Sequence, residues 1–360
     1  MVNNIISVTL IGATGFGAKE FLRLSQFHPE IEVIEIVSKS SSGKRITELH
    51  PELSGLTTCK EDKFSSTICT SSFDLKKTNP SSQRNFILLA LPHKESARFV
   101  EEYSEFLLES KVHIIDLSGN FRLNQSTPRE KWYGQMSKEI YANCFSFFTY
   151  GLPEINREKI KVARHIANPG CYATASILAL YPITKNLNAI SIAIDGKSGS
   201  SGAGRSPSSV FHHPELNGNS FPYKVMDHRH EPEISENLSL PSDLPLFFTP
   251  HVIPLSRGML VSCYVHLRED ISESYLDDLF INTFKNEKFI RLRNEPPQIK
   301  HVAGSNFCDI YWRIRGRQVS VIVAIDNLVK GMSGQAIQNI NVISGLEEST
   351  GLDHSGIGII

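Results

Sequence analysis

The sequence predicts a two-domain protein of the α/β class, in which a parallel sheet covered by helices is followed by an α+β domain with a mainly antiparallel sheet. Its 360 residues are enough for two domains, because single domains typically hold about 100–150 residues. In the first half, short apolar runs alternate with helical patterns, which is typical of parallel sheets. In the second half, strand-like runs predominate, which indicates antiparallel strands with helices on one face.

The first element is a strand that ends in a glycine turn. A β-branched run at residues 5–11 leads into the turn, a helical pattern follows at residues 19–27, and a second β-branched run occupies residues 31–37. In this context a glycine cluster holds a pyrophosphate at a helix amino terminus, although such turns also serve simple packing. The spacing is GxxGxG, not GxGxxG. The residues predicted to bind a dinucleotide are Gly12, Thr14, Gly15, Phe16 and Gly17.

The end of the second strand indicates which nicotinamide is bound. An NAD site places an acidic residue about 20 residues beyond the glycines to accept from the ribose 2′-hydroxyl. Here the strand runs into Ser38, Lys39 and Ser40 instead. Hydroxyls and a cation suit a 2′-phosphate, so the sequence favours NADP(H). The alternative is that this segment is a solvated loop.

Two further strands are predicted at residues 86–91 and 112–117, with a helix at residues 94–110 between them. The carboxyl ends of parallel strands form the edge where ligands bind. Pro92 follows the first of these strands, and Ser118 and Arg122 follow the second, so we expect all three at the cofactor cleft. Arg122 is a candidate anion clamp, with a surface salt bridge as the alternative.

The candidate nucleophile is Cys171. Residues 172–185 are apolar and rich in helix formers, which predicts a buried helix that begins at or beside this cysteine. Asn168, Pro169 and Gly170 precede it and require a sharp turn. A thiol there faces unpaired amides and the positive end of the helix dipole, which lowers its pKa. The alternative is a buried structural cysteine.

The second half supplies a candidate anion loop and candidate acid/base residues. A strand at residues 190–195 is followed by a glycine- and serine-rich loop that ends at Arg205; such a loop wraps an anionic group or serves as a flexible linker. His228 and His230 stand at the start of a predicted helix. Either imidazole could exchange a proton with the Cys171 thiol, and their spacing does not rank them.

The remaining elements complete the second domain. Strands are predicted at residues 246–254, 259–267 and 319–325, and a helix at residues 272–284. A last helix at residues 337–346 is expected to return to the first domain. We therefore expect a dinucleotide-binding domain at residues 1–167 plus 328–360, and a catalytic and oligomerisation domain at residues 168–327.

Composition excludes several classes of protein. The net charge of −1 gives no basic stripe for nucleic acid and no polybasic tail for a membrane surface, and no apolar stretch is long enough to span a bilayer. The amino terminus does not resemble a signal peptide. The six cysteines have no CxxC pairs, which argues against a metal site or a disulfide framework and indicates a reducing cytoplasm. They are Cys59, Cys69, Cys144, Cys171, Cys263 and Cys308.

Taken together, the motifs resemble the N-acetyl-gamma-glutamyl-phosphate reductase family of the semialdehyde dehydrogenase superfamily. The similarity runs nearly from end to end. It rests on the glycine turn and on residues 89–93, 150–154, 168–172, 201–205, 228–234, 249–260 and 326–331. The sequence departs from the family pattern at residues 118–122 and at Ala173. A His-His-Pro-Glu element at residues 212–215 is similar to one in reductases that act on aminoadipyl phosphate bound to the acidic carrier LysW.

The resemblance implies a Rossmann-type NADP-binding domain, an α+β domain that mediates self-association as a dimer or tetramer, and a cysteine thiolate mechanism. Cys171 would attack an acyl phosphate, NADPH would reduce the thioester, and His228 or His230 would move the proton. Asn327 would touch the cofactor, and Ser118, Arg122, Asn168 and Arg205 would hold substrate or phosphate. The expected product is N-acetylglutamate semialdehyde. Alternatives are a LysW-bound acyl phosphate of glutamyl or aminoadipyl length, or a redox sensor without catalysis.

Overall fold

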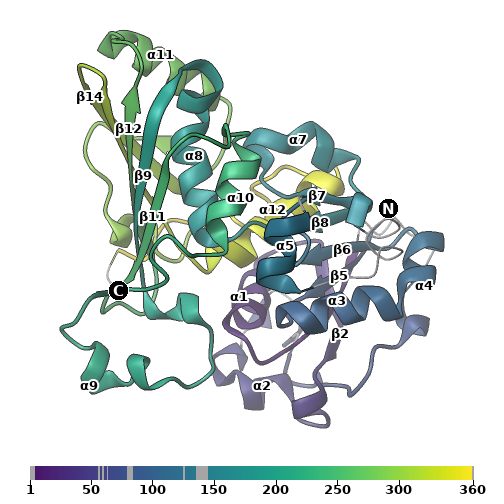
Figure 1. Cartoon of the computed structure of the whole chain (residues 1–360). Coiled ribbons are helices and arrows are strands. Elements are labelled where there is room, and N and C mark those ends of the chain that lie inside the picture. Colours follow the sequence, from purple (N-terminus) through teal and green to yellow (C-terminus); the bar gives the residue numbers. More distant parts are fainter. Residues whose placement is uncertain are drawn as a thin grey trace. The chain divides into compact units, whose positions relative to one another are not determined.

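The computed structural model describes residues 5–55, 57–58, 61–62, 64–78, 84–124, 126–134 and 145–358 (Figure 1). The chain forms two compact units. The first unit comprises Met1–Pro169 and Met332–Leu352, and the second comprises Gly170–Gly331 and Asp353–Ile360. The chain passes between the units three times, and two of these crossings lie next to residues of interest, one beside Cys171 and one beside the glycine of the Asp326–Gly331 motif.

The first unit contains a six-stranded sheet in the order β2-β1-β5-β6-β8-β7, in which every pairing is parallel. The β-branched runs form its centre because their side chains are buried on both faces, as parallel sheets require. This confirms the predicted Rossmann-type class. The strands are β1 (Ile6–Ile11), β2 (Ile31–Val37), β5 (Asn85–Leu89), β6 (His113–Asp116), β7 (Phe148–Tyr150) and β8 (His165–Ala167), with a separate pair β3 (Thr57–Thr58) and β4 (Glu61–Asp62).

One predicted helix of the first unit is wrong in its length. The pattern at residues 94–110 forms two helices, which break at Tyr103, where φ is −104° and ψ is 16°. The Tyr103 ring packs 5.3 Å from the ring of Phe73 and 4.7 Å from that of Phe99. Phe73 is distant in sequence, so this packing could not be foreseen. The helices are α1 (Phe16–Ser25), α2 (Ile46–Leu49), α3 (His93–Glu102), α4 (Ser104–Glu109), α5 (Ser126–Tyr133), α7 (Pro153–Lys161) and α12 (Gly334–Ile343).

The second unit contains a seven-stranded sheet in the order β10-β11-β9-β12-β15-β14-β13. Its pairings are antiparallel except for β11 with β9 and β13 with β14. The predicted α+β domain with a mainly antiparallel sheet is therefore confirmed. The strands are β9 (Ala189–Ser198), β10 (Phe221–Pro222), β11 (Leu246–Val252), β12 (Met259–Leu267), β13 (Ile290–Leu292), β14 (Cys308–Arg315) and β15 (Gln318–Ile325).

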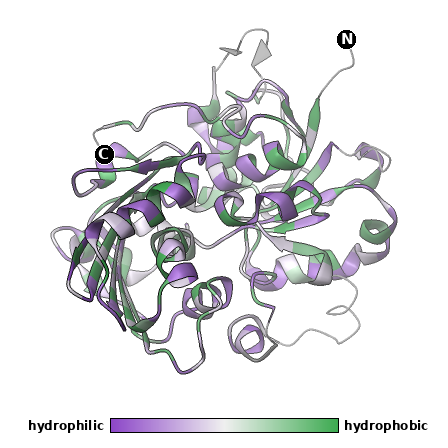
Figure 2. Ribbon diagram, turned by 90° about the horizontal axis from the view of Figure 1, so that it is seen from above, coloured by the Kyte–Doolittle hydropathy of each residue, from purple (hydrophilic) through white to green (hydrophobic). Residues whose placement is uncertain are grey.

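Helices cover one face of this sheet. The apolar helix α8 (Cys171–Asn186) packs on β12 and β15, and α10 (His230–Asn237) and α11 (Glu273–Phe284) pack on α8. Figure 2 shows hydrophobic and hydrophilic residues interspersed along many of the strands and helices of the chain. A short helix α9 (His213–Leu216) precedes β10. None of the helices in the described ranges has the length and apolar character needed to cross a membrane.

Short 3₁₀ and π segments complete the description. In the first unit the 3₁₀ segments are η1 (Lys39–Ser41), η2 (Pro51–Leu53), η3 (Leu75–Lys77) and η4 (Phe145–Phe147). In the second unit they are η5 (Ser200–Ala203), η6 (Ser209–Phe211) and η7 (Ile299–His301), and the π segment η8 (Val329–Ser333) leads into α12.

Candidate active site

Cys171 is the first residue of α8, as the sequence predicts. Gly170 caps the helix with an extended backbone, at φ −74° and ψ 148°, and no acidic residue lies in the first turn. The half-buried Cys171 thiol therefore stands at the amino terminus of a 16-residue helix. Unpaired amides and the helix dipole favour an anion at this position. The geometry suits a nucleophilic thiolate.

Two contacts fix the backbone on either side of this thiol. The Gly170 amide donates to Oε1 of Glu233 at 2.8 Å, and Glu233 lies fully buried on α10. Gly331 packs so closely that an added Cβ would lie 2.7 Å from the Cβ of Cys171. The sequence motifs alone indicate no role for either residue. The sequence feature that could have indicated Glu233 as part of the site is its position, one helical turn after His230.

The two histidines lie around the ring of Tyr172, the neighbour of Cys171. The ring centroids of His228 and His230 are 5.9 and 6.1 Å from that of Tyr172 and 4.7 Å from each other. Nδ1 of His228 accepts from the His230 amide at 3.1 Å, which leaves its proton on Nε2. Burial, with the charges of Arg229 and Lys224, lowers the pKa of His228 to about 3.

Electrostatic effects connect the thiol with two tyrosines. Burial is the main cause that raises the pKa of Tyr223 to about 12, and the charge of Cys171 adds to it. Burial also raises the pKa of Tyr172, with contributions from Tyr223 and Cys171. The Tyr223 ring lies 5.6 Å from that of His228. The predicted thiol and imidazoles therefore belong to one cluster in the second unit.

The other described cysteines have a different environment. Cys69, Cys263 and Cys308 are buried, and burial raises the pKa of the Cys69 and Cys263 thiols. Cys171 is thus the most accessible of the four described thiols. Cys59 and Cys144 lie outside the described residues.

The glycine turn in the first unit contains two glycines with different surroundings. Gly12 has φ +98°, and an added Cβ would lie 2.5 Å from the carbonyl oxygen of Ala90. Gly15 caps α1, and an added Cβ there would meet no atom within 4 Å. The turn is therefore closed at its base and open at the helix amino terminus, where a pyrophosphate fits. Thr14 precedes Gly15, and Phe16 opens α1.

Several other residues surround this turn. Nε2 of His50 lies 2.7 Å from the carbonyl oxygen of Ala13, a contact that the sequence analysis missed. An added Cβ at Gly17 would lie 2.6 Å from the sulfur of Met332.

Beyond β2, Ser38 is buried, whereas Lys39 and Ser40 are exposed at the start of η1. Pro92 is the N-cap of α3.

Arg122 is buried, whereas the alternative considered for it was a place at the surface. Its Nε donates to the carbonyl of Asn168 at 2.7 Å and its Nη2 to that of Leu117 at 3.0 Å. Nδ2 of Asn168 donates to the carbonyl of Met332 at 3.0 Å. Ser118 donates to Asp116, whose pKa is raised by burial. In the first unit, Arg122 thus holds the ends of β6 and β8 together.

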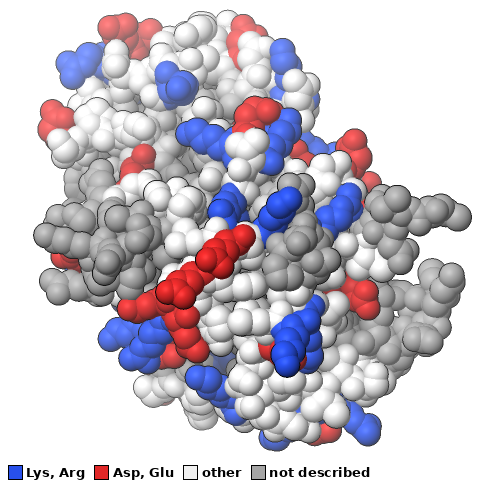
Figure 3. All heavy atoms as spheres, turned by 90° about the vertical axis from the view of Figure 1, so that its right-hand side faces the viewer, with Lys and Arg blue, Asp and Glu red and all other residues white. Residues whose placement is uncertain are grey.

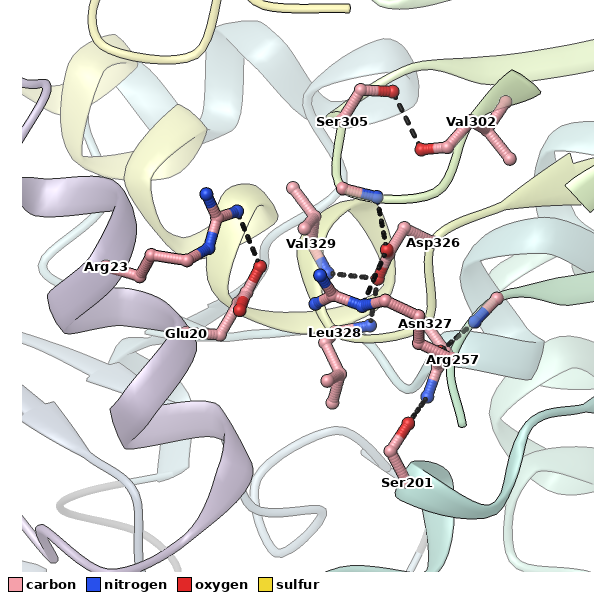
Figure 4. Close-up of polar contacts among 12 residues, drawn as sticks. Glu20, Arg23, Ser201, Arg257, Val302, Ser305, Asp326, Asn327, Leu328 and Val329 are labelled. Atoms are coloured by element: carbon pink, nitrogen blue, oxygen red, sulfur yellow. Dashed lines mark hydrogen bonds and ion pairs between the residues drawn. The ribbon is translucent and has the colours of Figure 1, made fainter. Parts of the chain in front are cut away.

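The predicted anion loop and Asn327 are in direct contact. Nδ2 of Asn327 donates to Oγ of Ser201 at 2.9 Å, and its Oδ1 accepts from the Gly258 amide at 2.6 Å (Figure 4). Asn327 is buried, whereas Arg205 is exposed at the end of the loop. The amide predicted to touch the cofactor therefore also has partners within the second unit.

Comparison with known proteins agrees with this arrangement. A model of the semialdehyde dehydrogenase NAD binding domain matches residues 7–163, and one of the semialdehyde dehydrogenase dimerisation domain matches residues 171–327. The fold is also that of aspartate semialdehyde dehydrogenase II from Vibrio cholerae, at 18% identity and TM-score 0.67 over 94% of this chain and 98% of that one. The enzyme from Candida albicans, solved with NADP, has 13% identity and TM-score 0.65 over 95% and 99%.

Curated relatives are similar over almost the whole chain. The N-acetyl-gamma-glutamyl-phosphate reductase of Methanosphaera stadtmanae is 39% identical over 98% of both chains. That of Campylobacter jejuni is 39% identical over 96% of this chain and 98% of its own. That of Pelotomaculum thermopropionicum is 38% identical over 98% and 99%. With its glycine turn and its cysteine at the mouth of α8, the chain belongs to the N-acetyl-gamma-glutamyl-phosphate reductase family of semialdehyde dehydrogenases.

Proposed function

We propose that this protein reduces N-acetyl-gamma-glutamyl phosphate to N-acetylglutamate 5-semialdehyde and phosphate with NADPH, in arginine biosynthesis. The observation that carries the proposal is the placement of Cys171 at the open amino terminus of α8, with buried imidazoles around the adjacent tyrosine. The names of the relatives support the substrate. In this proposal the first unit binds the cofactor and the second performs the chemistry. A reducing cytoplasm would keep the thiol free.

The residues support a covalent mechanism in which the atoms balance. The Cys171 sulfur bonds to the acyl carbon while the bond from that carbon to the phosphate oxygen breaks, and phosphate leaves with the electron pair. When bound, NADPH supplies the hydride that reduces the thioester carbon. An imidazole protonates the resulting hemithioacetal oxygen and removes that proton again as the carbon–sulfur bond breaks, which releases the aldehyde and the thiolate.

His230 is the proposed acid/base. An effective general acid or base has a pKa near the working pH, whereas that of His228 is lowered to about 3. His228 is therefore neutral throughout the working range and supports His230 by accepting from its backbone amide. We assign His228 to positioning the start of α10 and His230 to proton transfer.

The proposed cofactor is NADP(H). The turn after β2 carries Ser38, Lys39 and Ser40 with no acidic side chain among them, which favours a 2′-phosphate over a 2′-hydroxyl. Replacing Lys39 with Glu should raise the KM for NADPH about tenfold or more and leave that for NADH nearly unchanged. Steady-state kinetics with both cofactors is the measurement. Wild-type protein that prefers NADH would contradict this assignment.

The role of Cys171 is tested by substitution. Cys171→Ser should lower phosphate-dependent reduction of NADP⁺ with the semialdehyde by at least about 10³-fold, because a hydroxyl is a far weaker nucleophile than a thiolate. Binding of NADPH, followed by its fluorescence, should not change. Cys263→Ala is the matched control, since that thiol is buried in β12 of the same unit. Turnover by the Cys171 variant at the wild-type rate would refute the mechanism.

The rival substrate is an acyl phosphate on an acidic carrier protein such as LysW. Such a carrier needs a complementary basic surface. On the face shown in Figure 3, the described lysines and arginines are interrupted by a band of acidic residues, which does not favour a carrier there. Turnover on free N-acetylglutamate semialdehyde, compared with its carrier-bound aminoadipate homologue, separates the two substrates. A redox sensor would turn over neither.

The protein carries a dimerisation domain, and its family supports a homo-oligomer. We propose that the face of the second-unit sheet opposite α8 receives the second copy. Tyr264 and Phe247 are exposed on this sheet. A shallow concavity of about 560 Å³ is lined by Tyr264, His266, Arg313, Arg315 and residues of β9 and β15. Exposed aromatic and arginine side chains are typical of interface centres.

A further inference from the structure

The loop after β2, residues 38–45, includes the residues proposed to select NADP(H). It carries the exposed cations Lys39, Lys44 and Arg45 and has no acidic side chain. A loop of this kind binds a phosphate more tightly when it is already held in one conformation, because ordering it during binding costs free energy. The contacts that hold this loop are therefore relevant to which cofactor is bound.

A short segment of the first unit, residues 67–70, pairs with both ends of this loop and is named the bracing segment here. At the first end, the amide of Ser38 donates to the carbonyl of Thr70 at 2.9 Å. Near the other end, the amide of Gly43 donates to the carbonyl of Cys69 at 2.9 Å. The conformation of the loop therefore depends on where the bracing segment lies.

The carboxylate of Glu35, on β2, holds the bracing segment in turn. This side chain is fully buried. Its Oε1 accepts from Nζ of Lys77 at 3.1 Å and from the Thr70 hydroxyl at 3.4 Å, and its Oε2 accepts from the Asp74 amide at 3.4 Å. Asp74 caps η3 and Lys77 ends it. One carboxylate therefore contacts both ends of η3 and the last residue of the bracing segment.

Packing alone does not explain a carboxylate at position 35. The next two residues of β2, Ile36 and Val37, are buried and apolar. Desolvation offsets much of the attraction between a buried carboxylate and a cation, and well-packed apolar side chains are often at least as stabilising. What the carboxylate adds is a set of directional contacts with residues 70–77, which an apolar side chain cannot make.

We propose that Glu35 is a positioning residue for cofactor selection. Through the bracing segment, it keeps residues 38–45 in the conformation that receives the 2′-phosphate of NADP(H). This inference rests on the proposed function and deepens it, because it traces the preference for NADP(H) to a buried group that acts through other residues.

The glycine turn, which would bind the pyrophosphate common to both nicotinamide cofactors, has other neighbours. The Ala90 amide donates to the carbonyl of Ile11 at 2.8 Å, and the carbonyl of Ala90 lies against Gly12. Loosening the bracing segment should therefore weaken binding of the 2′-phosphate and leave binding of the pyrophosphate nearly unchanged.

The test compares binding of NADPH and NADH to the full-length protein by fluorescence titration. Glu35→Gln removes the charge that attracts Lys77. It should raise the Kd for NADPH about five- to tenfold and change that for NADH by less than about twofold. Lys77→Met keeps the apolar stem and should shift the NADPH constant in the same direction. This second variant keeps the test usable if Glu35→Gln fails to fold.

Glu30→Gln is the matched control. Glu30 directly precedes β2 and pairs with Nη1 of Arg84 at 2.9 Å, so this variant loses an ion pair at the opposite end of the same strand. It should leave the ratio of the two dissociation constants at the wild-type value. If Glu35 only stabilises the fold, Glu35→Gln should lower the melting temperature without changing this ratio, and that result would overturn the proposal. An equal rise in both constants would also overturn it.

Hydrogen exchange separates this inference from the proposed function. In protein without cofactor, the amides that join the loop and β2 to the bracing segment should exchange faster in Glu35→Gln than in Glu30→Gln. These amides are those of Ser38, Gly43, Ile46, Cys69 and Thr70. Faster exchange in a protein whose wild type prefers NADH would refute the proposed cofactor and leave the bracing role. Equal exchange in the two variants would refute the bracing role.

Discussion

At the scale of single residues, His228 shows how burial lowers the pKa of an imidazole beside the candidate nucleophile. Its ring lies between those of Tyr172, Tyr223, Phe248 and His230, and it is kept neutral by this environment. A neutral Nδ1 accepts the backbone amide at the start of α10. Protonating this buried ring costs free energy, so the folded state loses stability when the pH is low enough to protonate His228.

Stability should fall in acid because of His228. Its pKa is about 6.5 in the unfolded chain and about 3 in the fold, so its contribution is complete above pH 6.5 and is lost as the pH falls toward 3. Between about pH 7.5 and 5.5, this one group should cost about 1.4 kcal/mol of unfolding free energy. Urea unfolding of wild type and His228→Asn at both pH values should show this difference. Equal losses in the two proteins would contradict it.

At the scale of elements, the β1–α1 turn contains two glycines with different reasons to be glycine. Gly12 needs its positive φ and has the Ala90 carbonyl against it, whereas Gly15 has an ordinary φ of −77° and open space. The first requirement belongs to folding. The second has no steric cause among the described residues, which agrees with the proposed cofactor site.

The two glycines should therefore respond differently to alanine. Gly12→Ala should destabilise the protein by about 3 kcal/mol, from backbone strain and the clash with Ala90. Gly15→Ala should leave the free energy of unfolding in urea within about 0.5 kcal/mol of wild type but weaken NADPH binding about tenfold. Fluorescence titration with NADPH measures the latter. Wild-type affinity in Gly15→Ala would remove the turn from the proposed cofactor site.

At the scale of the whole molecule, the second-unit sheet has one face covered by helices and one face exposed. Side chains alternate along β12, so Val265 is buried while Tyr264 is 49% exposed. An exposed aromatic in the middle of a broad sheet, next to Arg313 and Arg315, is unusual for a monomer. A second copy of the chain would cover it.

Replacing Tyr264 with Arg should dissociate the oligomer. The variant adds like charge beside Arg313 and Arg315 on both copies, which removes an aromatic anchor and introduces repulsion. Light scattering after gel filtration should report a monomer where the wild type reports a dimer or larger. Tyr275→Arg, an exposed tyrosine on α11, is the control. An unchanged mass for Tyr264→Arg would place the interface elsewhere.

Local sequence patterns were sufficient to predict the strand, the turn and the helix that carry the candidate site residues. The β-branched run, the glycine turn and the start of α8 at Cys171 depend on residues within a few positions of one another, so their patterns predict them directly. The fold class followed from the order of these elements. The break at Tyr103 was not predicted from the local pattern, and there the Tyr103 ring packs against Phe73, which is distant in sequence.

Only the tertiary structure decided how these elements support the site. Glu233 meets the Gly170 amide across 63 residues, and Asn327 meets Ser201 across 126. Such partners come together because sheet order and helix packing bring distant segments to one place, and no local pattern encodes that meeting. The sequence by itself determined the reactive groups and the helix and turn that present them. Long-range contacts decided that His228 is buried and neutral, and which side chains hold the loops in position.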